Sequence, residues 1–246
     1  METIAVWFSC GAASAVAAHQ TLKLYGSTHN IRIINNPVIE EDEDNRRFLH
    51  DVEHWLGVSI EFAINPKYTH CSAVEVWDQR AFMSGPLGAP CTIELKKKAR
   101  QHWEATNTAH WHVLGFTAEE RPRYERFIES ERSNLLPVLI DAGITKQQCI
   151  DIVQAAGIQP PRLYKLGYPN ANCIGCVKAT SPTYWNHVRK HHPEVFQQRA
   201  EQSRRIGTKL VRVNNQRIFL DELSPTAKGM PLKTLAIDCG IFCEEL

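Results

Sequence analysis

Residues 3–16 read TIAVWFSCGAASAV, and this stretch decides the fold. It begins with an apolar run that suits a buried strand and leads into an alanine-rich segment, 12–24, with high helix propensity. Between the two lies a short turn of Ser9, Cys10 and Gly11. A strand, a turn of small residues and a helix in this order predict the beginning of an α/β domain.

The alternation of strands and helices continues beyond this stretch. The further runs predicted as strands are 31–35, 58–64, 112–116 and 217–220, with 135–140 as a strand or loop. The segments predicted as helices are 45–56, 145–156 and 181–206, the last interrupted at Pro193, and the loops between elements include 37–43 and 117–123. Thr145, followed three residues later by Gln148, predicts a capped helix start. We therefore expect a parallel sheet with helices on both faces, in one domain with a cysteine-containing C-terminal extension.

The composition narrows the class of protein. The formal net charge of +1 gives no global field for a nucleic acid or a membrane. The sequence contains no run of about 18 apolar residues, and its N-terminus lacks the basic start of a secretory signal. Eight cysteines in such a chain favour metal, cluster or redox roles in a reducing compartment over a disulfide framework. We expect a cytoplasmic protein that does not insert into membranes.

The small-residue turn is a candidate phosphate-binding loop. Small residues let the backbone approach a phosphate closely, and the amides at a helix N-terminus favour negative charge. A tight structural turn between strand and helix is the competing interpretation. The candidate binding residues are Ser9, Cys10, Gly11, Ala12, Ala13 and Ser14 in the loop, with Asn35 and Gly115 at the ends of the next predicted strands.

Cysteines form the second motif. The two-residue spacing of Cys173 and Cys176 lets both sulfurs face one metal or cluster. Further ligands must come from elsewhere, with Cys91 the best candidate and Cys239 and Cys243 the other available pair. Incidental buried thiols are the alternative interpretation.

Basic side chains form the third motif. Lys96 follows Cys91, and Arg121 and Arg123 follow the predicted strand at 112–116. Such groups suit phosphate or sulfate oxygens, although a solvated charged face is the common alternative. The acidic run 40–44 has the chemistry for Mg²⁺ but also fits a solvated loop.

Taken in order, these motifs resemble the phosphoadenylylsulfate (PAPS) reductase family, with its adenylylsulfate-reducing branch and its PP-loop ATP-pyrophosphatase relatives. The resembling segments are the loop Ser-x-Gly-x-x-Ser-Ala-Val, the stretch 161–176 (PRLYKLGYPNANCIGC), Cys91 before a basic segment, and 238–242 (DCGIF). Three positions depart from the family pattern. A single Cys91 stands where the family has a cysteine pair, Phe242 stands in place of a histidine, and Ala13 stands in place of the aspartate of ATP pyrophosphatases.

The resemblance implies a Rossmann-like, adenine nucleotide alpha-hydrolase-like fold, with residues 1–180 as the nucleotide-binding part and 181–246 as its extension. It implies a [4Fe-4S] cluster on Cys91, Cys173 and Cys176, with Cys243 or a substrate sulfur as the fourth ligand. Cys239 would be the nucleophile, and Lys96, Arg121 and Arg123 would neutralise phosphate and sulfate oxygens. The implied partners are an adenine nucleotide, a thioredoxin-like protein or a cysteine desulfurase, and a second copy of the chain.

Three functions remain open at this stage. The first is the thiol-dependent reduction of an adenylylsulfate to sulfite. The second is an ATP pyrophosphatase that uses Mg²⁺ and activates tRNA or DNA for sulfur insertion. Its nucleic-acid face would consist of Arg199, Arg204, Arg205, Lys209 and Arg212, unless these only decorate a solvated helix end. The third is a nucleotide sensor without catalysis, which Ala13 and Phe242 suggest.

Overall fold

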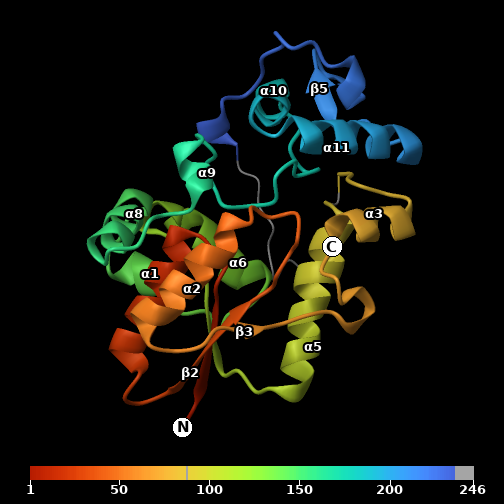
Figure 1. Cartoon of the computed structure of the whole chain (residues 1–246). Coiled ribbons are helices and arrows are strands. Elements are labelled where there is room, and N and C mark those ends of the chain that lie inside the picture. The colour runs from red at the N-terminus through yellow and green to blue at the C-terminus, as the bar shows by residue number, and fades with distance from the viewer. Residues whose placement is uncertain (87, 236–246) are drawn as a thin grey trace.

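The computed structural model describes residues 1–86 and 88–235. A four-stranded parallel sheet lies at its centre, in the order β3-β2-β1-β4 (Figure 1). The strands are β1 (Thr3–Trp7), β2 (Asn30–Asn35), β3 (Glu61–Phe62) and β4 (Trp111–Val113). The predicted α/β class and parallel sheet are confirmed.

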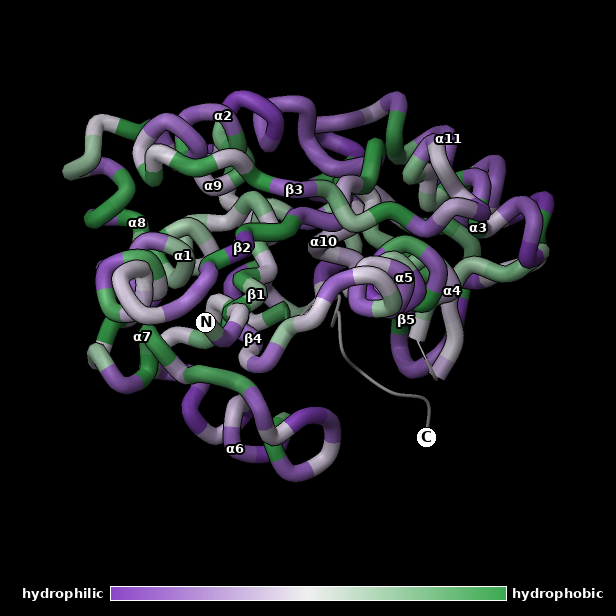
Figure 2. The backbone as a smooth tube through the Cα atoms, turned by 90° about the horizontal axis from the view of Figure 1, so that it is seen from below, coloured by the Kyte–Doolittle hydropathy of each residue, from purple (hydrophilic) through white to green (hydrophobic). Residues whose placement is uncertain are grey.

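Both faces of the sheet are covered, because β1 sends alternate side chains into two separate cores. Ile4 and Val6 belong to one core, and Ala5 and Trp7 to the other. All five residues of β1 are buried, as the apolar run predicted. Figure 2 shows this central part of the tube as mainly hydrophobic and the outer helix α6 as mainly hydrophilic.

Helices pack on each face of the sheet. The helices that contribute to the core with Ile4 and Val6 are α1 (Ala12–Tyr25), α2 (Asp44–Leu56), α7 (Val138–Asp141) and α8 (Lys146–Ala155). On the other face lie α5 (Lys98–Thr106) and α6 (Arg121–Ser130). There Trp103 of α5 meets Trp7 edge to face, with ring centroids 5.6 Å apart.

A third hydrophobic core joins the C-terminal region to the middle of the chain. Its elements are α3 (Ala73–Arg80), α10 (Pro182–His191), α11 (Pro193–Ile206) and the hairpin of β5 (Val211–Val213) and β6 (Gln216–Ile218). Trp77, Tyr184 and Trp185 are among its largest buried side chains. The loop that carries Cys173 and Cys176 packs against this core. The division of the chain at residue 180 stays a prediction.

Short elements complete the described chain. They are η1 (Pro66–Tyr68), α4 (Pro90–Thr92), the π-helical η2 (Ile93–Lys97), η3 (Ala118–Glu120), α9 (Arg162–Lys165), η4 (Leu220–Glu222) and η5 (Leu232–Thr234). Across residues 1–86 and 88–235, no helix has the length and apolar character needed to span a membrane.

Several local predictions were wrong. The strand expected at 58–64 is reduced to the two residues of β3. The loop expected at 117–123 contains η3 and the start of α6, because Glu120 accepts a hydrogen bond from the backbone N–H of Thr117 at 3.2 Å and closes a helical turn. The apolar run at 135–140 enters α7, and only Leu135 forms a β-bridge, to His112. The helices α3 and α5 and the strand β5 were not predicted.

Other local predictions are confirmed. Thr145 and Gln148 form the expected capping box, with the Thr145 hydroxyl accepting from the Gln148 N–H at 3.2 Å. Pro193 starts the separate helix α11.

Candidate functional site

The candidate site lies at the carboxyl ends of β1 and β4. From β1 the chain proceeds outward to β2 and β3 on one side, while β4 lies on the other side. In open α/β sheets, ligands bind outside the carboxyl ends of the strands where the strand order reverses. The turn from β1 into α1 occupies this position, so topology and sequence motif indicate the same place.

Ser14 organises the turn from within. Its hydroxyl oxygen accepts from the backbone N–H of Ser9 at 3.1 Å and of Gly11 at 3.3 Å. The same hydroxyl donates to the carbonyl of Gly11 at 2.9 Å. The Ser14 hydroxyl proton is therefore used inside the loop, and the groups left for an anion are backbone amides of the first turn of α1, which have no intrahelical acceptors.

Gly115, just beyond β4, allows the close approach of strand and loop. A Cβ atom at this residue would lie 2.8 Å from the Ser14 nitrogen and 3.0 Å from the Ala13 carbonyl carbon. Both are backbone atoms and cannot rotate away. Gly115 therefore acts by being small, which lets α1 begin against the end of β4.

Asn35 and Cys10 are buried residues that contact each other at the Ser9–Ser14 loop. The Asn35 amide donates to the carbonyl of Phe8 at 2.8 Å and lies 3.5 Å from the Cys10 sulfur. Asn35 is buried, so its contacts hold the loop. Cys10 has a φ of 55°, a left-handed conformation in which a non-glycine residue is strained. Burial and the nearby Glu41 carboxylate raise the pKa of its thiol, which keeps Cys10 protonated.

Tyr164 of α9 contacts the loop through its hydroxyl. This residue was not predicted as a site residue. Its hydroxyl accepts from the Ala12 N–H at 3.3 Å, between residues 152 positions apart. The position a Cβ of Gly11 would take is also 3.3 Å from this hydroxyl, so Gly11 leaves room for it. The only signal in the sequence was the Leu-Tyr pair of the stretch 161–176. The contact joins that stretch to the small-residue turn.

Lys96 is the predicted basic residue that the structure brings towards the loop. It lies in η2 and pairs with Glu41 at 3.4 Å, and both charges act on the Cys10 thiol, with the Lys96 charge lowering the thiol's pKa. π-Helical turns are rare in proteins, and those that occur often lie at functional sites.

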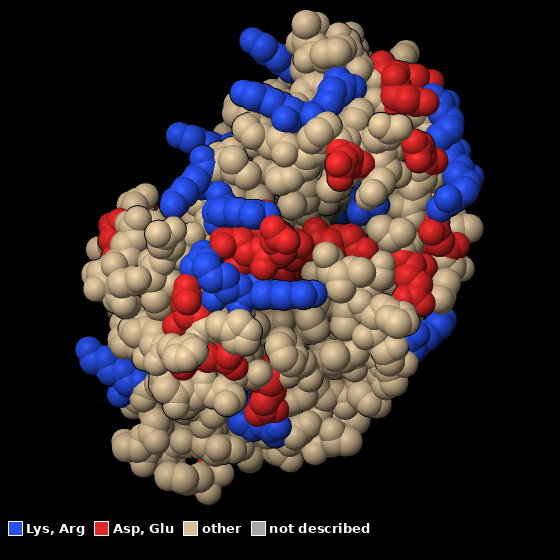
Figure 3. Space-filling view, viewed as in Figure 1, with Lys and Arg blue, Asp and Glu red and all other residues tan. Residues whose placement is uncertain are grey.

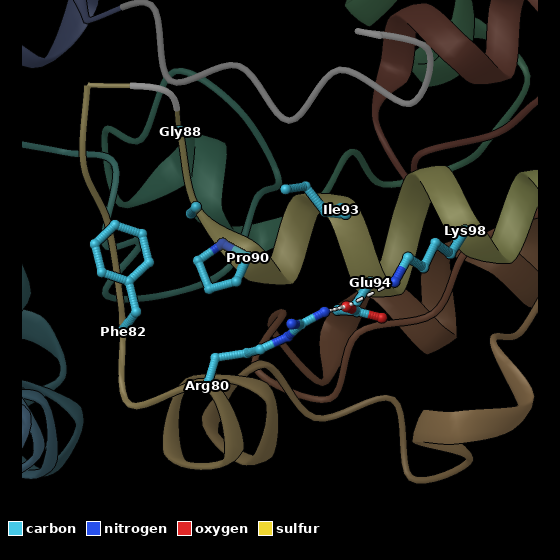
Figure 4. A pocket seen from close by; sticks show the side chains of 8 residues that line it. Arg80, Phe82, Gly88, Pro90, Ile93, Glu94 and Lys98 are labelled. Atoms are coloured by element: carbon cyan, nitrogen blue, oxygen red, sulfur yellow. Dashed lines mark hydrogen bonds and ion pairs between the residues drawn. The ribbon is translucent and has the colours of Figure 1, made fainter. Parts of the chain in front are cut away.

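The segment that carries Lys96 is anchored by Glu94. This carboxylate is almost fully buried and pairs with Arg80 and with Lys98, the latter at 3.0 Å. The three residues line a cavity of about 350 Å³ beside Pro90 and Ile93 (Figure 4). Because the two cations of this cavity face the Glu94 carboxylate, the cavity is a poor site for an anion.

The two arginines predicted with Lys96 lie elsewhere. Arg123 donates to Glu120 at 2.6 Å and lies over the Phe116 ring at 4.9 Å. Arg121 is exposed at the start of α6. No hydrogen bond or ion pair joins either of them to the Ser9–Ser14 loop within the described chain.

Side chains of the acidic run 40–44 hold other segments of the chain in place. The Glu40 carboxylate accepts from the backbone N–H groups of Ala73 at 2.7 Å and Val74 at 3.1 Å, and so caps α3. The Asp42 side chain is fully buried and pairs with Arg162 at 2.8 Å. Hydrogen bonds from Arg47 hold the pKa of Asp44 below its ordinary value. The solvated loop considered from the sequence is therefore wrong for these residues.

The cysteine loop is held by backbone contacts. The Ile174 N–H donates to the carbonyl of Glu40 at 3.0 Å, and the Cys176 N–H donates to the hydroxyl of Tyr184 at 2.8 Å. Cys176 is buried, and Cys173 and Cys91 are half-buried against the same core. In the parts of the chain that the structure describes, no three His, Cys, Asp or Glu side chains are arranged to hold a metal ion. Cys239 and Cys243 lie outside the described residues.

Three members of the basic face considered for nucleic acid are buried or paired with a carboxylate. Arg199 is buried, and Arg204 pairs with Asp221 at 2.6 Å. Arg205 pairs with Asp78 at 2.5 Å. Figure 3 shows acidic and basic side chains side by side across the middle and right of this view, and basic side chains gathered at its upper left.

No protein-family model matches the chain, and no curated protein matches it.

Proposed function

We propose that the chain binds an adenine nucleotide at the turn from β1 into α1 and acts on its sulfur, as the PAPS-reductase resemblance implies. The observation that carries the proposal is the position of this turn. It lies where the strand order reverses, it presents first-turn amides of α1, and it has Lys96 nearby. The docking of Tyr164 supports it, because this contact brings the stretch that ends in the cysteine loop onto the nucleotide loop.

The reaction that we propose is reduction of an adenylylsulfate. The amides of Ala13 and Ser14 and the Lys96 ammonium would hold the phosphate and sulfate oxygens. The Cys239 thiolate would attack the sulfate sulfur, forming a sulfur–sulfur bond while the bond from sulfur to the phosphate oxygen breaks and the nucleotide leaves. An external dithiol would then supply two electrons, releasing sulfite and becoming a disulfide.

The cysteines have the donor chemistry of a cluster site. Cys91 and Cys173 both act electrostatically on the buried Arg199, and this cation suits a centre ligated by thiolates. In residues 1–86 and 88–235 no three His, Cys, Asp or Glu side chains are arranged to hold a metal ion, so a cluster would require other ligands, for which Cys239 and Cys243 have the right chemistry. A [4Fe-4S] cluster held there would tune the electrostatics near the sulfate.

The alternative function is ATP-dependent sulfur insertion into a nucleic acid, and the experiment must distinguish it from reduction of an adenylylsulfate. Its predicted basic face is mostly paired or buried, which is why reduction comes first. Under this alternative, ATP is converted to AMP only when nucleic acid and Mg²⁺ are present. A nucleotide sensor would bind without turnover.

The test is calorimetric titration of the anaerobically purified full chain with adenylylsulfate, ATP and AMP, followed by a sulfite-release assay with thioredoxin or a small dithiol. We expect Lys96→Met to weaken adenylylsulfate binding about tenfold, since a hydrogen bond to a charged group contributes about 1.5–3 kcal/mol. Lys98→Met is the matched control, because Lys98 pairs with Glu94 and not with the loop. A folded chain that binds none of these nucleotides would contradict the proposal.

A further inference from the structure

The hairpin of β5 and β6 closes with a tight two-residue turn. Val213 and Gln216 pair across the strands, and Asn214 and Asn215 between them have φ values of 47° and 62°. Two consecutive residues in the left-handed region are typical of a type I′ turn, whose twist matches that of the paired strands. The turn therefore fixes which residues of the two strands lie opposite each other.

The two faces of the hairpin differ in character. Val211 is buried, and Ile218 directly opposite packs against the third hydrophobic core. Arg212 and Arg217 form the next opposite pair, and both are exposed. Side chains of opposite residues leave the same face of an antiparallel strand pair, with Cβ atoms about 4.5–5.5 Å apart. The register therefore places two guanidinium groups side by side on the solvent face.

These two charges are not balanced by a carboxylate. Neither Arg212 nor Arg217 forms an ion pair with any residue that the structure describes, and the Arg217 guanidinium donates to the carbonyl of Leu210 at 3.0 Å. Burial and the positive charge of Arg212 lower the pKa of Arg217. Like charges directly opposite each other destabilise a strand pair. An anion bound by both arginines would remove this repulsion.

A third cation, Lys209, lies just before β5. Lys209 is exposed, and its ammonium lies over the Phe219 ring, 5.5 Å from the centroid. Residues 208–218 contain these three cations and no acidic residue. Asn214 and Asn215 add exposed amide donors at the turn. The hairpin is thus a positive surface rich in hydrogen-bond donors, and Figure 1 shows β5 at the far end of the molecule from the N-terminus.

We propose that the β5–β6 hairpin is an interaction surface for the phosphate backbone of a nucleic acid, with Arg212, Arg217 and Lys209 as the contacting cations. Planar guanidinium groups match phosphate oxygens through paired hydrogen bonds. A two-stranded ribbon also fits the width of the major groove of duplex DNA. None of the exposed large hydrophobic side chains of the described chain lies on the hairpin. This disfavours a protein interface or a membrane surface, since both need apolar contacts.

The surface is separate from the nucleotide site. The hairpin packs on the third core, whereas the turn from β1 into α1 belongs to the core with Ile4 and Val6. The inference therefore goes beyond the proposed function and does not depend on it. Lys209 and Arg212 belong to the basic face considered from the sequence, and strand pairing adds Arg217 to them.

The test is fluorescence anisotropy of the full chain with a labelled DNA duplex and a labelled RNA strand of the same sequence. Three phosphate contacts predict that the logarithm of the affinity falls with the logarithm of the salt concentration with a slope of about −2.7 for the duplex and about −2.1 for the single strand. The arm with the higher affinity identifies the nucleic acid. We expect Arg212→Glu to weaken binding about tenfold or more, through loss of a charge-assisted contact. The same change creates an opposite-charge pair with Arg217 and should keep the melting temperature at or above that of the wild type.

Lys23→Gln is the matched control, because Lys23 is an exposed cation in the last turn of α1. It changes the net charge by one, as Arg212→Gln does, and should bind as the wild type does. Arg212→Gln and Arg217→Gln should each reduce the salt slope by about 1.

Wild-type affinity in a folded Arg212→Glu variant, or an equal loss of affinity in Lys23→Gln, would overturn the role of the hairpin. A wild-type chain that binds neither nucleic acid, or that binds a labelled acidic peptide more tightly than both, would overturn the nucleic-acid partner. The assay contains no adenine nucleotide, so either failure leaves the proposed function to its own titration.

Discussion

Replacing Gly115 by alanine tests the contact that builds the candidate site. The new Cβ would lie 2.8 Å from the backbone nitrogen of Ser14, where ordinary contact begins at 3.4 Å. The start of α1 or the end of β4 must therefore move by about half an ångström, since neither atom belongs to a flexible side chain. Overpacking of this kind costs about 1–3 kcal/mol of the free energy of unfolding.

Urea unfolding and thermal melting measure this cost. In a chain of this size, each kcal/mol lowers the melting temperature by roughly 2–4 °C. Nucleotide binding should weaken as well, because the displaced backbone carries the amides of Ala13 and Ser14. Loss of about one charge-assisted hydrogen bond corresponds to about a tenfold weaker affinity.

Gly143→Ala is the matched control for this experiment. Gly143 has a φ of 64° and no atom within 4 Å of its added Cβ, so alanine there is strained but meets no neighbour. It should lower stability by about 1–2 kcal/mol and leave nucleotide affinity unchanged. If Gly115→Ala matches the wild type in both stability and affinity, the close packing of β4 on α1 is refuted.

Three further substitutions test other parts of the structure. Tyr164→Phe removes the acceptor of the Ala12 N–H and should cost about 1–3 kcal/mol in urea unfolding; an unchanged midpoint would argue against the docking of α9 on the loop. Thr145→Ala should cost about 1 kcal/mol through loss of the N-cap of α8, with nucleotide affinity unaffected. Burial and the charges of Arg132 and Arg100 lower the pKa of His112 to about 3, below its unfolded value of about 6.5. The contribution of neutral His112 to the free energy of unfolding is therefore complete above about pH 6.5 and is lost by up to about 1.4 kcal/mol per pH unit as the pH falls towards 3. His112→Gln should reduce this loss of stability in acid. An identical dependence of stability on pH in the variant and the wild type would contradict the assignment to His112.

The sequence alone determined the features that depend on neighbouring residues. The apolar run of β1, the small-residue turn and the alanine-rich start of α1 predicted the strand, the loop and the helix, because each signal lies within a few positions. The capping of α8 by Thr145 and the break at Pro193 followed in the same way. Hydrophobic periodicity and backbone preferences act locally, so they could be predicted without the fold.

Only the tertiary structure decided how distant groups combine. Tyr164 reaches Ala12 across 152 positions, and Arg205 meets Asp78 across 127. The sequence grouped Arg199 with exposed arginines, yet packing of α11 on the cysteine loop buries it. A charge on a helix becomes a surface group, an ion pair or a buried group according to what packs against it. That depends on the whole chain, because the free energy of a charge is set by its burial and its partners.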